Sequence, residues 1–299
     1  MSKMGIQDLM GSYVAIVTPM SEDGGIDFSA LEKLIEFHIE NGTHGIVAVG
    51  TTGESATLSV DEHIQVVEFT VQKVAGRIQV IAGTGANSTS EAIHLTQLAK
   101  EAGVDACLLV VPYYNKPTQQ GLYLHFKAIA EAVDIPQILY NVPGRTVLSM
   151  DNATVQRLAD IDNIIGIKDA TGNIELGADL IKRVQGKMTV LSGDDASALD
   201  LIKVGAKGNI SVTANILPKQ MSEMCVAAVE GDLSTAESIN QSMKEINQQL
   251  FVESNPIPIK WVMHEAGMIK SGIRLPLTSL ALAHQMSVKS AVKAFGIVD

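Results

Sequence analysis

The 299-residue sequence has few cysteines, no excess of positive charge and no long apolar run. Its two cysteines, Cys107 and Cys225, lie in apolar segments without zinc-ligand spacing, which predicts reduced, buried thiols. The net charge is −11 and no Lys/Arg-rich run occurs, so neither nucleic acid nor an anionic membrane is an expected partner. No apolar stretch reaches the roughly 18 residues of a membrane-spanning helix, and residues 1–11 lack a signal-peptide core. We therefore expect a soluble, cytoplasmic protein.

Patterns that bind metals or phosphates are missing as well. None of the seven histidines belongs to an HxH or HExxH pair, which argues against a metal site. The glycine-rich stretches GTTGES (50–55) and GTGANS (83–88) lack the GK[ST] of a P-loop, and by themselves they indicate only tight turns. We expect no metal and no cofactor.

What the sequence does contain is a regular alternation of strand-like and helix-like segments. The strand patterns cover 13–17, 45–49, 78–82, 106–111, 136–140, 164–168, 188–191 and 209–212, and the helix patterns cover about 28–39, 59–75, 90–102, 122–132, 152–159, 174–184, 196–204 and 218–229. Eight such units favour the α/β class and a closed (β/α)8 TIM barrel. A doubly wound open sheet is the structural alternative, but the GxGxxG turn expected after its first strand is absent.

The strand pattern stops after Gly231. Helical patterns follow at 233–250, 258–266 and 287–295, without a low-complexity linker. We therefore predict a catalytic barrel over residues 1–230 and a small C-terminal helical extension over 231–299 that packs on it.

The strand at 164–168 ends on a lysine. Its apolar, β-branched residues indicate a strand covered on both faces, so the amine of Lys168 should be partly desolvated. Desolvation lowers the pKa of a lysine, and a neutral amine can attack a ketone to form a Schiff base. The alternative is an ordinary lysine at the rim with its ammonium in water.

Active sites of such barrels lie at the carboxyl ends of the strands. The other polar residues at those ends are mainly hydroxyl-bearing: Thr18, Thr51, Thr52, Thr84, Tyr114, Tyr140, Ser192 and Ser211. Hydroxyl groups can bind a carboxylate and relay protons without placing a competing charge beside an amine. The sequence thus predicts one reactive lysine surrounded by hydroxyl groups.

Several charged and aromatic residues near these ends have more than one interpretation. Asp194 and Asp195 follow the seventh strand, would repel a phosphate, and are better explained as helix caps than as catalysts. Arg145, on a Pro-Gly turn, is either a solvated charge or a bidentate carboxylate clamp. Tyr113 and Tyr114 could equally be packing aromatics.

Five motifs in order resemble the dihydrodipicolinate synthase family. They are GTTGES (50–55), PYYNKP (112–117), YNVPGRT (140–146), GIKDATG (166–172) and SGDD (192–195), and NPIPIKW (255–261) extends the resemblance into the tail. Members of this family are Schiff-base-forming lyases. They condense pyruvate with L-aspartate-4-semialdehyde to 4-hydroxy-tetrahydrodipicolinate, in lysine and diaminopimelate biosynthesis.

The resemblance implies a role for each matching residue. Lys168 would form the Schiff base with pyruvate, and Tyr140 would donate and accept protons beside it. Thr51 would link Tyr140 to Tyr114, which reaches in from a neighbouring subunit of a homotetramer, a dimer of dimers. The implied substrate-binding residues are Thr51 and Thr52 for the pyruvate carboxylate, Arg145 for the aldehyde's carboxylate, and Gly193 and Ile210 through their backbones.

The resemblance also implies feedback inhibition by L-lysine. The matching allosteric residues are Ser55, Ala56, His63, Asn87, Glu91 and Tyr113. Two positions depart from the family pattern. Asp169 stands where glutamate is frequent, and Val60 stands where some lysine-inhibited members have histidine, which predicts weaker inhibition.

Two alternative functions remain at this stage. One is another pyruvate-forming aldolase of the same superfamily, such as a sialic acid lyase or a keto-deoxy sugar acid aldolase, although Arg145 favours a small carboxylated aldehyde. The other is a non-catalytic binding protein on a barrel scaffold. The presence together of Lys168, Tyr140, Thr51 and Tyr114 argues against the second.

Overall fold

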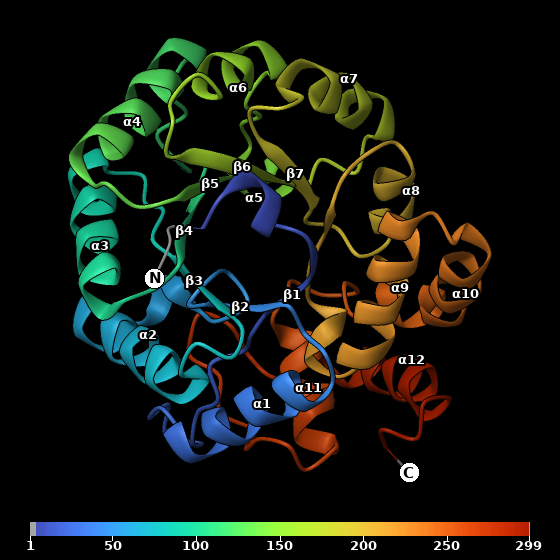
Figure 1. Ribbon diagram of the computed structural model, residues 1–299. Helices are drawn as coiled ribbons and strands as arrows, with labels where there is room; N and C mark the ends of the chain where they lie inside the picture. The colour runs from blue at the N-terminus through green and yellow to red at the C-terminus, as the bar shows by residue number, and fades with distance from the viewer. Residues whose placement is uncertain (1–3, 299) are drawn as a thin grey trace.

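The computed structural model describes residues 4–298, and its centre is a closed barrel of eight parallel strands (Figure 1). The strands pair in chain order, and β1 also pairs with β8 to close the barrel. They are β1 (Gly11–Ala15), β2 (Gly45–Ala48), β3 (Gln79–Gly83), β4 (Ala106–Val110), β5 (Gln137–Asn141), β6 (Ile164–Asp169), β7 (Thr189–Ser192) and β8 (Gly208–Ser211). The predicted (β/α)8 fold is confirmed.

Helices form a ring around the barrel, and the short helix α5 lies inside this ring in the view of Figure 1. They are α1 (Phe28–Glu40), α2 (Val60–Val74), α3 (Thr89–Ala102), α4 (Gln119–Ala132), α5 (Pro143–Thr146), α6 (Asn152–Leu158), α7 (Ile174–Val184), α8 (Ala198–Lys203) and α9 (Pro218–Glu230). Three short 3-10 helices accompany them: η1 (Ile6–Asp8), η2 (Ser55–Thr57) and η3 (Thr213–Asn215).

Local sequence signals explain where these helices begin and which face they bury. Leu31, Leu34 and Ile35 recur at helical spacing and form the buried face of α1. The Ser59 side chain accepts a hydrogen bond from the N–H of Glu62, whose carboxylate accepts from the N–H of Ser59. This capping box satisfies two backbone donors at the start of α2.

Two layers of apolar side chains fill the molecule. One lies between the strands and the surrounding helices, and includes Val14, Ile46 and Ile167. The other contains Leu9, Tyr13 and other residues that alternate with the first set along the strands, so it fills the barrel interior. Because the interior is packed, a ligand has access only at the ends of the barrel.

Three further helices follow the barrel: α10 (Leu233–Gln249), α11 (Ile257–Glu265) and α12 (Leu282–Lys293). In Figure 1, α10 lies beside α9, and α12 lies beside α10. The division of the chain at residue 230 stays a prediction. Within residues 4–298, no helix is both long and apolar enough to cross a membrane.

Candidate active site

A cavity of about 150 Å³ lies at the carboxyl ends of the strands. Six of the eight predicted catalytic and substrate-binding residues line it: Thr51, Thr52, Tyr140, Arg145, Lys168 and Gly193. They come from loops or strand ends that are up to 142 residues apart in sequence, from Thr51 to Gly193. The closed barrel is what brings them together.

Lys168 projects from β6 and is buried, with 6% of its surface exposed. The pKa of its amine is lowered to about 8: burial is the largest cause, the carboxylate of Asp195 opposes it, and the positive charge of Arg145 adds to it. Its Nζ lies 4.3 Å from the centroid of the Tyr140 ring. At pH 7, roughly one Lys168 side chain in ten is therefore a free amine.

This lowered pKa predicts the pH dependence of activity. Only the free amine attacks a carbonyl, so log kcat/KM for pyruvate should rise with a slope near 1 below about pH 8 and level off above it. Steady-state rates between pH 6 and 9.5 measure this profile. A flat profile between pH 6.5 and 8.5 would contradict the assignment of Lys168 as the reacting amine.

Tyr140 is the penultimate residue of β5 and is buried next to Lys168. Burial raises the pKa of its phenol to about 12 and Asp194 also raises it, while Arg145 and a hydrogen bond with Thr51 lower it. The phenol is therefore protonated at neutral pH. A protonated phenol beside an amine can donate a proton to an alkoxide and take one back from a neighbouring carbon.

Arg145 stands on the short helix α5, directly after Pro143 and Gly144. Its side chain is exposed at the mouth of the cavity, and its Nη2 donates a hydrogen bond to the backbone oxygen of Asn255 at 2.9 Å. This hydrogen bond holds the guanidinium through one of its two terminal nitrogens, Nη2. Its remaining donors are available to a ligand carboxylate, as a clamp requires, and the role of Arg145 stays a prediction.

Tyr114 and Ile210 do not line this cavity. The side chain of Tyr114 is 92% exposed and its backbone is left-handed, with a φ of 74°. Ile210 of β8 is buried among the interior apolar side chains. The roles expected for these two residues stay predictions.

One polar residue of the site, Asn255, was not predicted from the sequence, and two others, Asp194 and Asp195, were interpreted only as helix caps. Asn255 lines the cavity, and its Nδ2 donates to the Thr52 hydroxyl at 3.0 Å. Asp194 also lines the cavity. Asp195 is buried and accepts from the N–H groups of Val212 and Thr213, so it caps η3 rather than the helix that follows it in sequence. The NPIPIKW motif was the available signal for Asn255.

Three of the six residues matched to the lysine site line a second cavity of about 320 Å³: Ser55, Ala56 and Tyr113. Asn87 is nearby, because its Nδ2 donates to the backbone oxygen of Tyr113 at 3.2 Å. Burial raises the pKa of the Tyr113 phenol, and the negative charge of Glu91 is a second, smaller cause of the increase. His63 is buried, its Nε2 has no hydrogen-bond partner among the residues that the structure describes, and burial lowers its pKa.

Within residues 4–298, no three His, Cys, Asp and Glu side chains gather in an arrangement that could hold a metal ion. The site instead combines a buried amine of lowered pKa, a protonated phenol and a guanidinium at the carboxyl end of a (β/α)8 barrel. This combination defines a class of enzyme, the barrel lyases that bind a carbonyl substrate as a Schiff base.

Comparison with known proteins gives the particular family. The model of the Dihydrodipicolinate synthetase family matches residues 8–295, and the chain belongs to this family. It is 59% identical over 290 residues to the 4-hydroxy-tetrahydrodipicolinate synthase of Pseudomonas putida (strain W619), which covers 97% of this chain and 99% of the relative.

Solved structures agree with this assignment. The chain is similar to the chloride-inhibited dihydrodipicolinate synthase from Acinetobacter baumannii complexed with pyruvate, with a TM-score of 0.96, 58% identity, and coverage of 97% and 100% of the two chains. It is also similar to the lysine-bound enzyme from Cyanidioschyzon merolae, with a TM-score of 0.94, 38% identity, and coverage of 97% and 99%. The family predicted from the five motifs is confirmed.

Proposed function

We propose that this chain condenses pyruvate with L-aspartate-4-semialdehyde through a Schiff base on Lys168 and releases 4-hydroxy-tetrahydrodipicolinate. This reaction is a step of lysine and diaminopimelate biosynthesis. The observation that supports it most is the buried Lys168 amine of lowered pKa, in a cavity that also holds Tyr140 and Arg145. The name of the Pseudomonas putida relative and the pyruvate in the Acinetobacter baumannii complex agree with it.

The first half of the reaction activates pyruvate. The free amine of Lys168 attacks the ketone carbon, Tyr140 donates a proton to the resulting alkoxide, and water leaves to give a protonated imine. Thr51 and Thr52 hold the pyruvate carboxylate with hydroxyl and backbone donors. The imine draws electrons from the methyl group, which loses a proton to give an enamine, so no cofactor is needed as an electron sink.

The second half forms the new carbon–carbon bond and frees the enzyme. The enamine carbon attacks the aldehyde carbon of the semialdehyde, whose oxygen takes a proton. The amino group of the semialdehyde then attacks the imine carbon, displaces the Lys168 amine and closes the ring. Tyr140 serves each proton transfer, and Thr51 connects it toward solvent through Tyr114 of a neighbouring subunit.

Arg145 is proposed to bind the carboxylate of the semialdehyde, which predicts a selective defect. A charge-assisted hydrogen bond contributes roughly 1.5–3 kcal/mol, so Arg145→Ala should lower kcat/KM for the semialdehyde by about 10- to 150-fold. The rate of pyruvate imine formation should change much less. Steady-state kinetics and single-turnover trapping of the imine measure the two effects separately.

Two further variants are controls for this experiment. Arg145→Lys keeps the charge but loses the two-pronged geometry, so it should recover only part of the activity. Arg183→Ala removes an arginine that is paired with Asp179 on the outer surface, and it should leave both steps unchanged. Equal loss of imine formation and semialdehyde use in Arg145→Ala would mean that Arg145 only supports the local structure.

A substrate assay separates this function from its nearest alternative. Product formation from pyruvate and aspartate-4-semialdehyde is compared with condensation of pyruvate and N-acetylmannosamine. The clamp at Arg145 favours the small carboxylated aldehyde over a polyhydroxylated sugar. A higher kcat/KM with the sugar would instead assign the chain to the sialic acid lyase reaction.

We also propose that the chain acts in the cytoplasm as a homotetramer, a dimer of dimers. The support is the side chain of Tyr114, which is 92% exposed and absent from the cavity of its own chain. A neighbouring subunit that receives it would gain the outer member of the proton relay. Sedimentation velocity at micromolar concentration measures the assembly directly.

L-lysine is proposed as a feedback inhibitor that binds at Ser55, Ala56, His63, Asn87, Glu91 and Tyr113. Glu91 would pair with the α-amino group of lysine, and Tyr113 adjoins the relay residue Tyr114. The lysine-bound Cyanidioschyzon merolae relative supports the idea. Val60 removes a polar partner that some members of the family provide, so partial inhibition is expected.

A titration tests this lysine site. Millimolar L-lysine at subsaturating pyruvate should inhibit the wild type partially, in line with typical coupling free energies of roughly 1–3 kcal/mol. Glu91→Ala should lose most of this inhibition, whereas Glu101→Ala, on the exposed face of the same helix α3, should retain it. A wild type that does not respond, or equal inhibition of Glu91→Ala, would reject the site.

A further inference from the structure

A buried ion pair between Lys260 and Glu54 lies next to the turn that contains Thr51 and Thr52. Lys260 of α11 is 4% exposed, and its Nζ binds the carboxylate of Glu54, whose side chain is fully buried. The same Nζ also donates to the backbone oxygen of Thr18 at 3.1 Å. A residue of the C-terminal segment is therefore joined to the loops that follow both β1 and β2.

The backbone of this turn is strained. Glu54 adopts a left-handed conformation with φ 59° and ψ 38°, and Val49 at the start of the turn has a φ of 52°. Non-glycine residues rarely adopt such angles, and β-branched valine is especially unfavourable there. Such conformations persist only where the surrounding contacts determine them, and they concentrate at functional sites.

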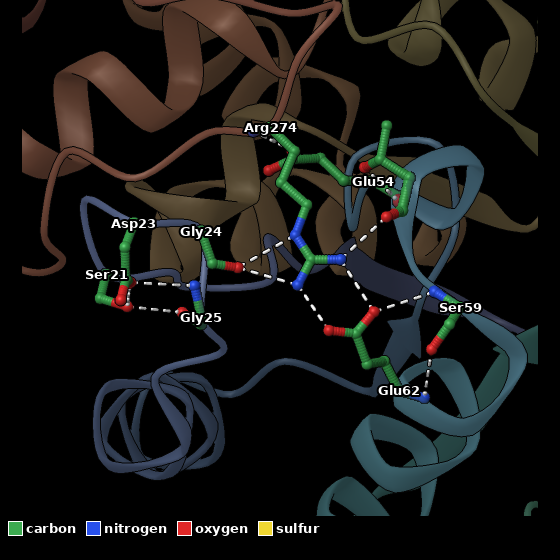
Figure 2. Close-up of polar contacts among 9 residues, drawn as sticks. Ser21, Asp23, Gly24, Gly25, Glu54, Ser59, Glu62 and Arg274 are labelled. Carbon is green, nitrogen blue, oxygen red and sulfur yellow. Dashed lines mark hydrogen bonds and ion pairs between the residues drawn. The ribbon is translucent and has the colours of Figure 1, made fainter.

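Arg274 supplies a second set of contacts around Glu54. Its backbone N–H donates to the Glu54 carboxylate at 3.1 Å, and its guanidinium donates to both carboxylate oxygens of Glu62 at 2.5 and 2.8 Å. The guanidinium also donates to the backbone oxygens of Gly24 and Thr57, each at 2.8 Å. Figure 2 shows Arg274 between the Gly24 loop on one side and the capped start of α2 on the other.

Asn255 connects the same C-terminal segment to the cavity itself. Its Nδ2 donates to the Thr52 hydroxyl at 3.0 Å, and its backbone oxygen accepts from Arg145 at 2.9 Å. The segment from Asn255 to Arg274 therefore contacts the proposed pyruvate-binding turn at two places, Thr52 and Glu54.

We propose that Lys260 and Glu54 are positioning residues, which hold the strained turn so that Thr51 and Thr52 meet the carboxylate of pyruvate. This inference rests on the proposed function. Neither residue lines the cavity around Lys168, so they act through the turn rather than on the substrate. A buried ion pair adds little net stability compared with apolar side chains of the same size. We therefore infer that the role of the Lys260–Glu54 pair is to fix the conformation of the turn.

The experiment compares a double variant with a conservative one. Removal of one partner leaves a buried charge unpaired and destabilises the fold, so Lys260→Met and Glu54→Gln are combined in one protein. Glu54→Asp keeps the ion pair but shortens the side chain by one methylene, which draws the turn toward Lys260. Lys73→Met is the matched control, because Lys73 pairs with Glu32 on the outer surface between α1 and α2.

The double variant should unfold within a few degrees of the wild type, yet its kcat/KM for pyruvate should fall roughly 30-fold or more, since a 1 Å misplacement can cost about 100-fold. Glu54→Asp should remain folded and raise KM for pyruvate severalfold, and Lys73→Met should change neither constant. At saturating pyruvate, borohydride should still label Lys168 in every variant.

Two outcomes would overturn the positioning role. One is a double variant with wild-type kinetics. The other is a loss of activity in both the double variant and Glu54→Asp that matches the unfolded fraction of each protein. Failure of the proposed function would look different, because pyruvate and borohydride would then leave Lys168 unlabelled in the wild type itself.

Discussion

Replacement of Lys168 by alanine should lower the rate of condensation by a factor on the order of 10⁴ or more, while the barrel stays folded. The amine is the only group proposed to become covalently bound to pyruvate, so no neighbouring residue can take over its role. The side chain is buried and its pKa is lowered mainly by desolvation. Burial outweighs the attraction of Asp195 for the ammonium, so removal of the amine should cost the fold no net favourable charge interaction.

Two variants separate chemistry from packing in this experiment. Lys168→Met keeps most of the side-chain volume without the amine, and it should be as inactive as Lys168→Ala. Lys187→Ala removes an exposed lysine paired with Asp160 and should keep full activity. Thermal unfolding of all three variants should stay near that of the wild type. Activity within 100-fold of the wild type in either Lys168 variant would disprove covalent catalysis by this residue.

A single added methyl group at Gly193 should also abolish most activity. A Cβ at this position would lie 2.6 Å from Cε and 2.7 Å from Cγ of Lys168, closer than real Cβ contacts allow. The lysine would have to leave its position or the end of β7 would have to shift. Because a misplacement of about 1 Å can cost roughly 100-fold in rate, Gly193→Ala should lose at least that much kcat.

The contacts of the added Cβ are with side chains, those of Lys168 and Ala170, and not with backbone atoms. Gly193→Ala should therefore fold, and its imine with pyruvate should form slowly even at saturating substrate. Gly144→Ala is the control, since a Cβ placed there meets no atom of residues 4–298 within 4 Å outside its own chain neighbours and helix backbone. Normal imine formation in Gly193→Ala would show that Lys168 does not need its present conformation.

The fold could be predicted because its signals are local. Alternating apolar segments and cap residues such as Ser59 mark the units along the chain, and eight units imply closure. The predicted ends of helices differ from those in the structure where these local signals are weak. The helix predicted at 287–295 begins at Leu282 in the structure. Its N-cap residue, Ala281, has no side-chain acceptor, so the sequence carries no capping signal that marks this start. The four-residue helix α5 (Pro143–Thr146) was predicted as a turn.

The site could be predicted only in part, for a physical reason. Lys168 and Tyr140 each lie one residue before the end of a largely apolar strand, so the barrel geometry places them at the carboxyl end without further information. Asn255 and Lys260 reach the site from more than 200 residues beyond Thr52 and Glu54. No local pattern encodes such a contact, and the partner of Lys260 is Glu54, whose backbone is left-handed.

Reductive trapping of the wild-type protein is the most direct test of Schiff-base formation by Lys168. The protein is incubated with pyruvate and borohydride, digested, and mapped by peptide mass spectrometry, with a sample lacking pyruvate as the control. Covalent catalysis by Lys168 predicts loss of activity that depends on pyruvate and a single label on the peptide that contains Lys168. A label on another lysine, or inactivation without any label, would contradict it.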